Sequence, residues 1–253
     1  MTDPCLFAII GGTGYDQLAD FTPNRTEWIE TPWGQPSAPV LWGDLYGVSI
    51  AFLPRHGLDH TLAPHLINYR ANLWALDAIG VSRILALAAV GGISREMAPG
   101  CLMVPDQLID YTHGRVQTYW EPDSESVRHI DFTEPYDSKL RHQLLETAER
   151  LALPVLSHGT YAVTQGPRLE TAAEIRRLER DGCDVVGMTA MPEAALAREL
   201  GMAYACCAMV SNWAAGKGEE PIHRDLERHL NRAKNQFNRL LRAGLPDWIP
   251  KRA

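Results

Sequence analysis

The chain has 253 residues, a formal net charge of −7 and 45% hydrophobic residues, with a mean hydropathy of −0.20. This length is enough for one large hydrophobic core. The acidic balance argues against a nucleic-acid partner, which would favour a basic face, and no apolar run reaches the roughly 18 residues of a membrane helix. The sequence therefore predicts a soluble globular protein with no nucleic-acid and no membrane partner.

The cysteines and the N-terminal residues indicate a cellular compartment. The five cysteines are odd in number and scattered, and Cys206 and Cys207 are adjacent within an apolar run. Free cysteines in such a run behave as small hydrophobic residues, and a disulfide framework is not expected. The apolar segment Leu6–Ile10 is too short for a signal peptide and leads into a glycine-rich turn, so we interpret it as the first strand. These features predict a reduced, cytoplasmic protein.

Strand-like and helix-like segments alternate along the chain. The predicted strands are Phe7–Ile10, Val48–Leu53, Ile84–Val90, Tyr161–Thr164, Val185–Gly187 and Tyr204–Val210, and the predicted helices are Leu66–Ile79, Ser138–Leu151, Thr171–Arg180, Pro192–Leu200 and Asp225–Arg242. Alternation of this kind predicts an α/β fold with a central mixed β-sheet flanked by helices. No repeat or linker divides the sequence, so we expect a single domain over residues 1–253. The polar stretch Tyr111–Asp131 is predicted to be a long loop, and loops of this length are often functional.

Polar residues follow three of the predicted strands. Gly11–Gly14 follows the first strand, where glycines allow close backbone approach and the Thr13 hydroxyl adds a donor. Arg55 and His56 follow the second, where they offer a bidentate guanidinium and a further donor. Thr189 follows a third. Each segment by itself is compatible with an ordinary turn, but together they favour one anion site.

The histidines near this segment also raise the question of a metal site. His56, His60 and His65 lie close together in sequence with Asp59. Their spacing fits no zinc pattern, and no second ligand cluster accompanies them. We predict no metal.

Several motifs occur together in one order. They are Gly11–Gly14, Pro54–Gly57, His65–Asn72, Gln165–Thr171 and Gly187–Glu193. In order and spacing this set resembles the trimeric purine nucleoside phosphorylases and, within them, the methylthioadenosine phosphorylase branch, from Phe7 to about Lys234. The resemblance implies a homotrimer, no metal and no organic cofactor, with phosphate as a co-substrate.

The resemblance also assigns the phosphate and ribose residues. Thr13, Arg55, His56, Thr189 and the backbone N–H of Ala89 would hold phosphate, and Met188 would lie against the ribose. One position departs from the branch, because Ala88-Ala89 stands where a Thr-Ala pair is usual. A hydroxyl contact to phosphate is therefore absent, and weaker phosphate binding is expected.

The base pocket departs further from the adenine-specific branch. Where that branch has Thr-Asp-Tyr-Asp, this chain has Ser211-Asn212-Trp213-Ala214, so both carboxylates are missing. Glu170 stands where the 6-oxopurine enzymes carry the glutamate that accepts from N1–H. Donor and acceptor counting then favours hypoxanthine or guanine over adenine. A helix-start carboxylate and a turn asparagine are the structural alternatives for Glu170 and Asn212.

The 5′ end of the sugar is assigned by resemblance alone. His129 stands where the family reaches into the site of a neighbouring subunit, although a loop histidine bonded within its own subunit is an alternative. Ile222 and His223 are expected near the same end, across a gap in the alignment.

The resemblance implies an enzyme of the pentosyltransferase type. Its expected reaction is reversible phosphorolysis of 5′-methylthioinosine to hypoxanthine and 5-methylthioribose 1-phosphate, with Asn212, Glu170 and His56 as catalytic residues. Ala214 and Met188 would line the substrate site. An inosine/guanosine phosphorylase, a methylthioadenosine phosphorylase and a non-catalytic nucleoside-binding protein are the alternatives.

Overall fold

The computed structural model describes residues 7–122, 126–127, 129–219 and 226–249. Its strands are β1 (Phe7–Gly11), β2 (Thr22–Glu27), β3 (Val40–Leu45), β4 (Val48–Pro54), β5 (Arg83–Gly92), β6 (Leu102–Met103), β7 (Gln107–Asp110), β8 (Val155–Leu156), β9 (Thr160–Val163), β10 (Val185–Gly187) and β11 (Ala203–Trp213). Its helices are α1 (Tyr69–Ala78), α2 (Ser138–Arg150), α3 (Ala172–Arg180), α4 (Ala190–Glu199) and α5 (Leu226–Trp248), with a short 3-10 turn at Pro64–Leu66.

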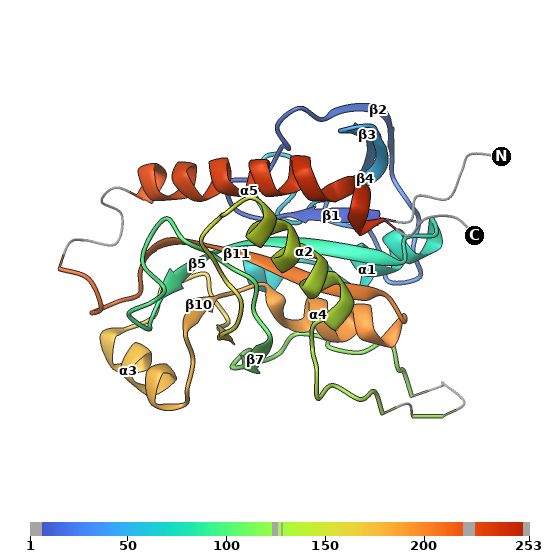
Figure 1. Ribbon diagram of the computed structural model, residues 1–253. Coiled ribbons are helices and arrows are strands. Elements are labelled where there is room, and N and C mark those ends of the chain that lie inside the picture. The colour runs from blue at the N-terminus through green and yellow to red at the C-terminus, as the bar shows by residue number, and fades with distance from the viewer. Residues whose placement is uncertain (1–6, 123–125, 128, 220–225, 250–253) are drawn as a thin grey trace.

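One mixed sheet runs through the molecule (Figure 1), in the order β2-β3-β4-β1-β5-β10-β9-β7, with β11 beside β5 and β6. The strands β4, β1, β5 and β11 are parallel neighbours, whereas β10 pairs with β5 in the antiparallel sense. The predicted mixed sheet is confirmed. All six predicted strands are present, and the sequence analysis missed β2, β3, β6, β7 and β8.

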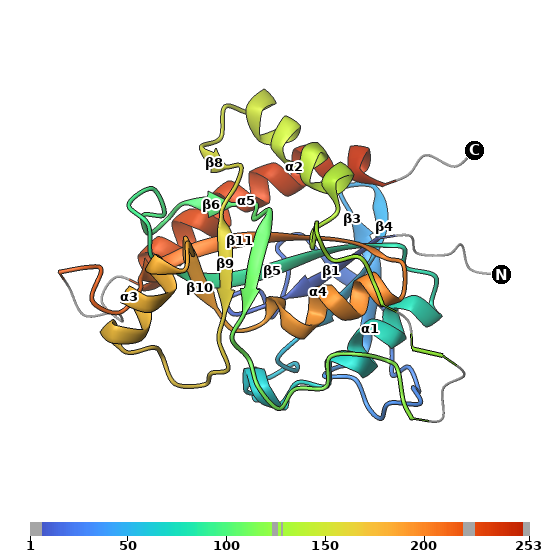
Figure 2. The ribbon, with the colours of Figure 1, turned by 90° about the horizontal axis from the view of Figure 1, so that it is seen from below.

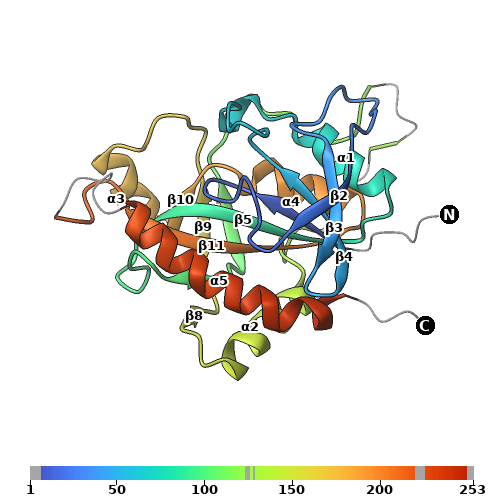
Figure 3. The same cartoon turned by 90° about the horizontal axis from the view of Figure 1, so that it is seen from above.

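Helices cover the two faces of this sheet. Figure 3 shows α5 and α2 across one face, and Figure 2 shows α4 and α1 on the other. The helix α5 buries Leu230, Ala233, Phe237, Leu240 and Leu241 at helical spacing, and these side chains join the core on its face of the sheet. The second core lies between the opposite face of the sheet, α1 and α4. The central strands are therefore apolar on both faces and rigidly held.

Local sequence signals set the starts of the helices. The Asn68 and Asp137 side chains accept from the backbone N–H groups of Ala71 and Leu140, which caps α1 and α2. Thr171 and Glu174 form a reciprocal capping box at the start of α3. The helix after β10 has non-helical backbone angles at Met191, so its regular part begins at Pro192, as predicted. The segment from Tyr111 to Asp131 contains no helix or strand among its described residues, in agreement with the predicted loop.

Candidate active site

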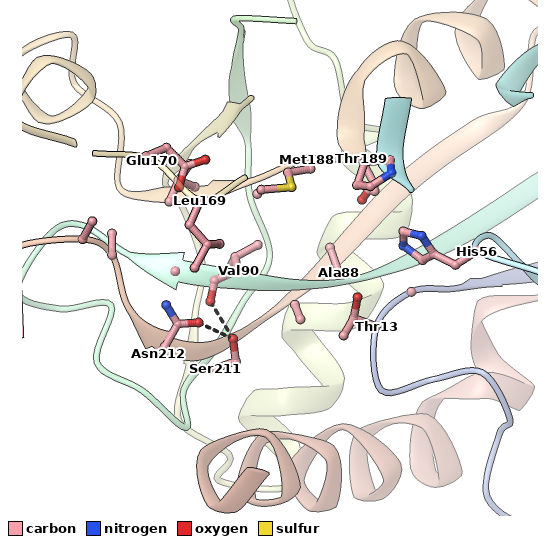
Figure 4. A pocket seen from close by; sticks show the side chains of 18 of the residues that line it. Thr13, His56, Ala88, Val90, Leu169, Glu170, Met188, Thr189, Ser211 and Asn212 are labelled. Atoms are coloured by element: carbon pink, nitrogen blue, oxygen red, sulfur yellow. Dashed lines mark hydrogen bonds between the residues drawn. The ribbon is translucent and has the colours of Figure 1, made fainter. Parts of the chain in front are cut away.

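A pocket of about 200 Å³ opens where the predicted site residues meet. It is lined by the ends of β1, β4, β10 and β11 and by the middle of β5. Because β10 runs antiparallel to β5, its carboxyl end returns to the middle of β5, beside Ala88 and Ala89. In Figure 4, Thr13, His56 and Thr189 lie at one end of the pocket, Glu170 and Asn212 lie at the other, and Met188 lies between them. Ala214 also lines the pocket.

The first end of the pocket has the features of an anion site. Thr189 lines the pocket in front of α4, and its side chain makes no capping hydrogen bond. Thr13, in the loop after β1, and Ala89 of β5 line the same space.

Close packing explains why residue 12, in the loop after β1, is a glycine. A Cβ atom on Gly12 would lie 2.4 Å from the Leu87 carbonyl oxygen and 2.8 Å from Nη1 of Arg55. A side chain at this position would push the loop away from β5. The glycine therefore holds the Thr13 segment close to the central strands.

The side chain of Arg55 is committed to the protein interior, which corrects the sequence-based picture of a free guanidinium. It is 1% exposed, and its Nε and Nη2 donate to the Glu193 carboxylate at 2.6 and 2.7 Å. Its Nη1 donates to the carbonyl oxygens of Gly11 and Leu87 at 3.4 and 3.0 Å. Four of the five N–H groups are thus used, and one on Nη2 remains without a partner among the described residues. Burial alone would lower the pKa of Arg55, but the Glu193 carboxylate more than offsets this and raises it.

Glu193 is a residue that the sequence analysis missed, although it ends a motif used for the resemblance. It is fully buried and also accepts from the Tyr204 hydroxyl at 2.8 Å. Because Arg55 follows β4 and also donates to Gly11 and Leu87, its pair with Glu193 joins the ends of β1 and β4 and the middle of β5 to α4. The sequence does contain one indication of this role, because Glu193 follows Pro192 within an apolar helix. A carboxylate is buried in such a helix only when it has a charged or hydrogen-bonding partner.

His56 presents an acceptor to the pocket, and the predicted donor role is wrong in the resting state. Its Nδ1 lies 2.8 Å from the Leu62 carbonyl oxygen, which can only accept, so Nδ1 carries the proton. Burial, together with the Arg55 charge, lowers the pKa of His56 to about 4. The neutral ring therefore leaves Nε2 as an acceptor, which suits the single O–H of a hydrogen phosphate ion.

The lowered pKa of His56 predicts a specific acid sensitivity. Above pH 6.5 the ring is neutral in the folded and unfolded states and contributes nothing. Between pH 6.5 and about 4 the unfolded state binds a proton that the folded state does not, so the free energy of unfolding should fall as the pH falls. We expect this residue to account for roughly 1–3 kcal/mol of the loss.

Urea unfolding of the wild type and of His56→Asn at pH 7 and pH 4.5 measures this effect. The variant should lose less stability on acidification than the wild type does. The matched control is His142→Asn, at an exposed histidine of α2, which should behave as the wild type. An equal loss in His56→Asn and the wild type would show that the ring is not held neutral.

The base end of the pocket contains two polar side chains with fixed orientations. Oε1 of Glu170 accepts from the Thr164 hydroxyl at 2.6 Å. Oδ1 of Asn212 accepts from the Ser211 hydroxyl at 2.7 Å, and its Nδ2 donates to the Trp213 carbonyl oxygen at 2.8 Å. A hydroxyl donor at one end and a carbonyl acceptor at the other define which end of the amide is nitrogen. One N–H and one oxygen lone pair of Asn212 remain for a ligand.

Arg115 connects the long loop to the strand ends around the pocket, and the sequence analysis missed it. Its guanidinium donates to the carbonyl oxygens of Met188, Met191 and Gln165 at 2.7, 2.6 and 2.8 Å. These carbonyls belong to the segments that follow β9 and β10. The predicted functional loop thus holds Met188 in place. The sequence gives no sign of this role, because a single arginine in a polar stretch has no distinctive pattern.

Two predicted groups are not brought into the pocket of the single chain. His129 is exposed and does not line it. Ile222 and His223 lie outside the described residues. Among the residues that the structure describes, no group of three or more His, Cys, Asp or Glu is placed to hold a metal ion. His60 instead pairs with Asp16 at 2.6 Å and stacks on His56.

The described cysteines, Cys101, Cys183, Cys206 and Cys207, are free thiols. Over the described part of the chain, no helix has the length and apolar character needed to cross a membrane.

Known proteins are similar to this chain over most of its length. A probable S-methyl-5'-thioinosine phosphorylase of Xylella fastidiosa is 55% identical over 84% of this chain and 86% of its own. The 6-oxopurine nucleoside phosphorylase of Pyrococcus furiosus is 45% identical over 96% of this chain and 93% of its own.

Solved structures are also similar to this chain over most of its length. Methylthioadenosine phosphorylase from Schistosoma mansoni in complex with adenine superposes with a TM-score of 0.88 at 32% identity, covering 96% of this chain and 91% of that one. The family described as the phosphorylase superfamily matches residues 6–245. With the mixed sheet and the pocket at its strand ends, this match shows that the chain belongs to the phosphorylase superfamily.

Proposed function

We propose that the chain catalyses reversible phosphorolysis of a 6-oxopurine nucleoside, and specifically of 5′-methylthioinosine to hypoxanthine and 5-methylthioribose 1-phosphate. The observation that carries this proposal is one pocket with an anion site at one end and Glu170 with Asn212 at the other. The names of the 55% and 45% identical relatives support the 6-oxopurine assignment.

The base end matches the edge of a 6-oxopurine. Such a base presents an acceptor at O6, a donor at N1–H and an acceptor at N7. The N–H left on Asn212 can donate to O6, its oxygen can accept from N7–H once that atom is protonated, and Glu170 can accept from N1–H. Adenine would set its N6 donor against the Asn212 donor and its N1 lone pair against Glu170. Each mispaired buried group costs roughly 1–3 kcal/mol.

Catalysis in this pocket relies on positioning and electrostatics. Thr13, Thr189, the Ala89 N–H and the remaining N–H of Arg55 would hold phosphate below C1′, while Nε2 of His56 accepts its remaining proton. As the glycosidic bond breaks, the phosphate oxygen attacks C1′ and the electron pair passes to the purine. Asn212 and Glu170 stabilise the purine as it gains charge and takes up a proton at N7, which balances the proton that the hydrogen phosphate ion gives up through His56 and water. No organic cofactor and no covalent enzyme intermediate are needed.

A panel of substrates tests the proposal. Methylthioinosine, methylthioadenosine, inosine, guanosine and adenosine are compared by kcat/KM, with and without phosphate. We expect phosphate-dependent release of hypoxanthine, with methylthioinosine above inosine and both above the adenine nucleosides. Faster cleavage of inosine or guanosine would favour an ordinary purine nucleoside phosphorylase. Cleavage of methylthioadenosine at least as fast as methylthioinosine would refute the 6-oxopurine preference. Binding without base release would indicate a non-catalytic nucleoside-binding protein.

We also propose that the active form is a homotrimer with shared sites. The long loop and the turn before α1 expose Leu66, Val116, Trp120 and Val127 by 63, 54, 39 and 55%. His129 lies on the same long loop and is exposed in the single chain. Large apolar side chains gathered on such segments are typical of surfaces between subunits.

The His129 assignment has a measurable consequence. His129→Ala should raise the KM for the nucleoside and leave the KM for phosphate within about twofold, because the contact would reach only the 5′ end of the neighbour's substrate. Steady-state kinetics and sedimentation at assay concentration check both parts. His158→Ala, at another exposed histidine, serves as the control. A fully active monomer would contradict the shared site.

A further inference from the structure

A hydroxyl group outside the substrate pocket controls one oxygen of Glu170. Thr164 follows β9 directly, and its Oγ1 lies 2.6 Å from Oε1 of Glu170 and 3.3 Å from the Gly187 carbonyl oxygen. A hydroxyl has one proton to donate, and the carboxylate is both nearer and charged. Thr164 therefore donates to Glu170. In the described part of the chain, no side-chain hydrogen bond engages Oε2 of Glu170.

Glu170 needs such a restraint because it stands between two cavities. One is the substrate pocket, and the other is a polar cavity of about 430 Å³ whose wall includes Thr164, Arg168 and Tyr111. A glutamate side chain without a fixed partner could turn its carboxylate into the second cavity, where Arg168 already pairs with Glu174. The bond from Thr164 limits this rotation.

We propose that Thr164 is a positioning residue for Glu170. By holding one carboxylate oxygen, it makes the site prefer a purine that presents one hydrogen-bond donor to Glu170 over a purine that presents two. This role rests on the proposed function. Hypoxanthine presents only N1–H at this edge, whereas guanine presents N1–H and an N–H of its 2-amino group. A free carboxylate receives two parallel donors, one on each oxygen. Here Oε1 already accepts from Thr164, so Oε2 can receive N1–H, while the 2-amino group would have to share Oε1 with the Thr164 hydroxyl. Inosine nucleosides are favoured over guanosine nucleosides.

The experiment compares inosine with guanosine, which differ only at C2 of the base. The variants are Thr164→Val, which keeps the shape and removes the hydroxyl, and Thr164→Ser, which keeps the hydroxyl. The control is Thr160→Val, on the adjacent strand β9, whose hydroxyl makes no side-chain hydrogen bond among the described residues. The wild type should prefer inosine in kcat/KM. Thr164→Val should lower the inosine-to-guanosine ratio roughly 5- to 10-fold, and Thr164→Ser and Thr160→Val should retain it.

The possible results distinguish a failure of the Thr164 proposal from a failure of the proposed function. An unchanged ratio in Thr164→Val, with activity retained, overturns the role of Thr164, as does an equal loss on both substrates. If that variant does not fold, the wild type still decides, because tighter binding of free guanine than of free hypoxanthine by calorimetry also overturns it. A wild type that shows no phosphate-dependent cleavage of either inosine or methylthioinosine refutes the proposed function instead.

Discussion

Replacing Glu193 with glutamine should lower the free energy of unfolding by about 3–5 kcal/mol, the usual effect of breaking one side of a buried ion pair. The Arg55 guanidinium would keep its charge in a site where it is 1% exposed, with no carboxylate to balance it. The new amide would also set N–H groups against the Arg55 donors. Urea unfolding at pH 7 with phosphate absent measures the change, because a bound ligand would add its own stabilisation.

The matched control is an exposed ion pair of the same chemistry. Arg25 and Glu27 pair at the surface of β2, with side chains 48 and 42% exposed. Glu27→Gln should change the free energy of unfolding by less than about 1 kcal/mol, because water already solvates both partners. If Glu193→Gln were no more destabilising than Glu27→Gln, the ion pair would not be the element that joins α4 to the strand ends.

Changing Asn212 to aspartate should shift the base preference of the enzyme toward 6-aminopurines. A carboxylate can accept from the adenine N6–H, but it repels O6 of hypoxanthine. We expect kcat/KM for methylthioinosine to fall roughly 10- to 100-fold, which corresponds to one mispaired buried group. The effect should fall mainly on kcat/KM, since the contact to N7–H strengthens only as the base departs.

Kinetics on methylthioinosine and methylthioadenosine, with phosphate saturating, measure the shift. The Ser211 hydroxyl can still donate to a carboxylate oxygen of the variant, but the hydrogen bond from Nδ2 to the Trp213 carbonyl oxygen is lost, so the side chain is less firmly held than in the wild type. A partial gain on methylthioadenosine is expected, because Ala214 supplies no second carboxylate. An unchanged ratio of the two substrates would mean that Asn212 does not contact the base.

The sequence by itself determined the order of the elements and the segments that form the pocket. Apolar strands between amphipathic helices predict a mixed sheet with helices on both faces, because these patterns bury one stripe of each helix. The segments that follow β1, β4, β9, β10 and β11 do meet at one pocket. The order of the motifs was enough to predict that these segments meet, because the strand ends of such a sheet lie close together. The short β6 and β8 and the exposed β2 left no such pattern, because strands of two residues or without apolar faces carry little periodicity.

Only the tertiary structure decided what each polar side chain does in the pocket. Arg55 looked free for phosphate in sequence, but Glu193, 138 positions later, accepts from two of its N–H groups, and the carbonyl oxygens of Gly11 and Leu87 accept from two more. His56 looked like a donor until the Leu62 carbonyl and the buried surroundings fixed its tautomer and lowered its pKa. Hydrogen bonds and burial join residues far apart in the chain, and both depend on three-dimensional distance. The sequence therefore identified polar residues that line the pocket, and the fold determined which of their donors and acceptors are left for a ligand.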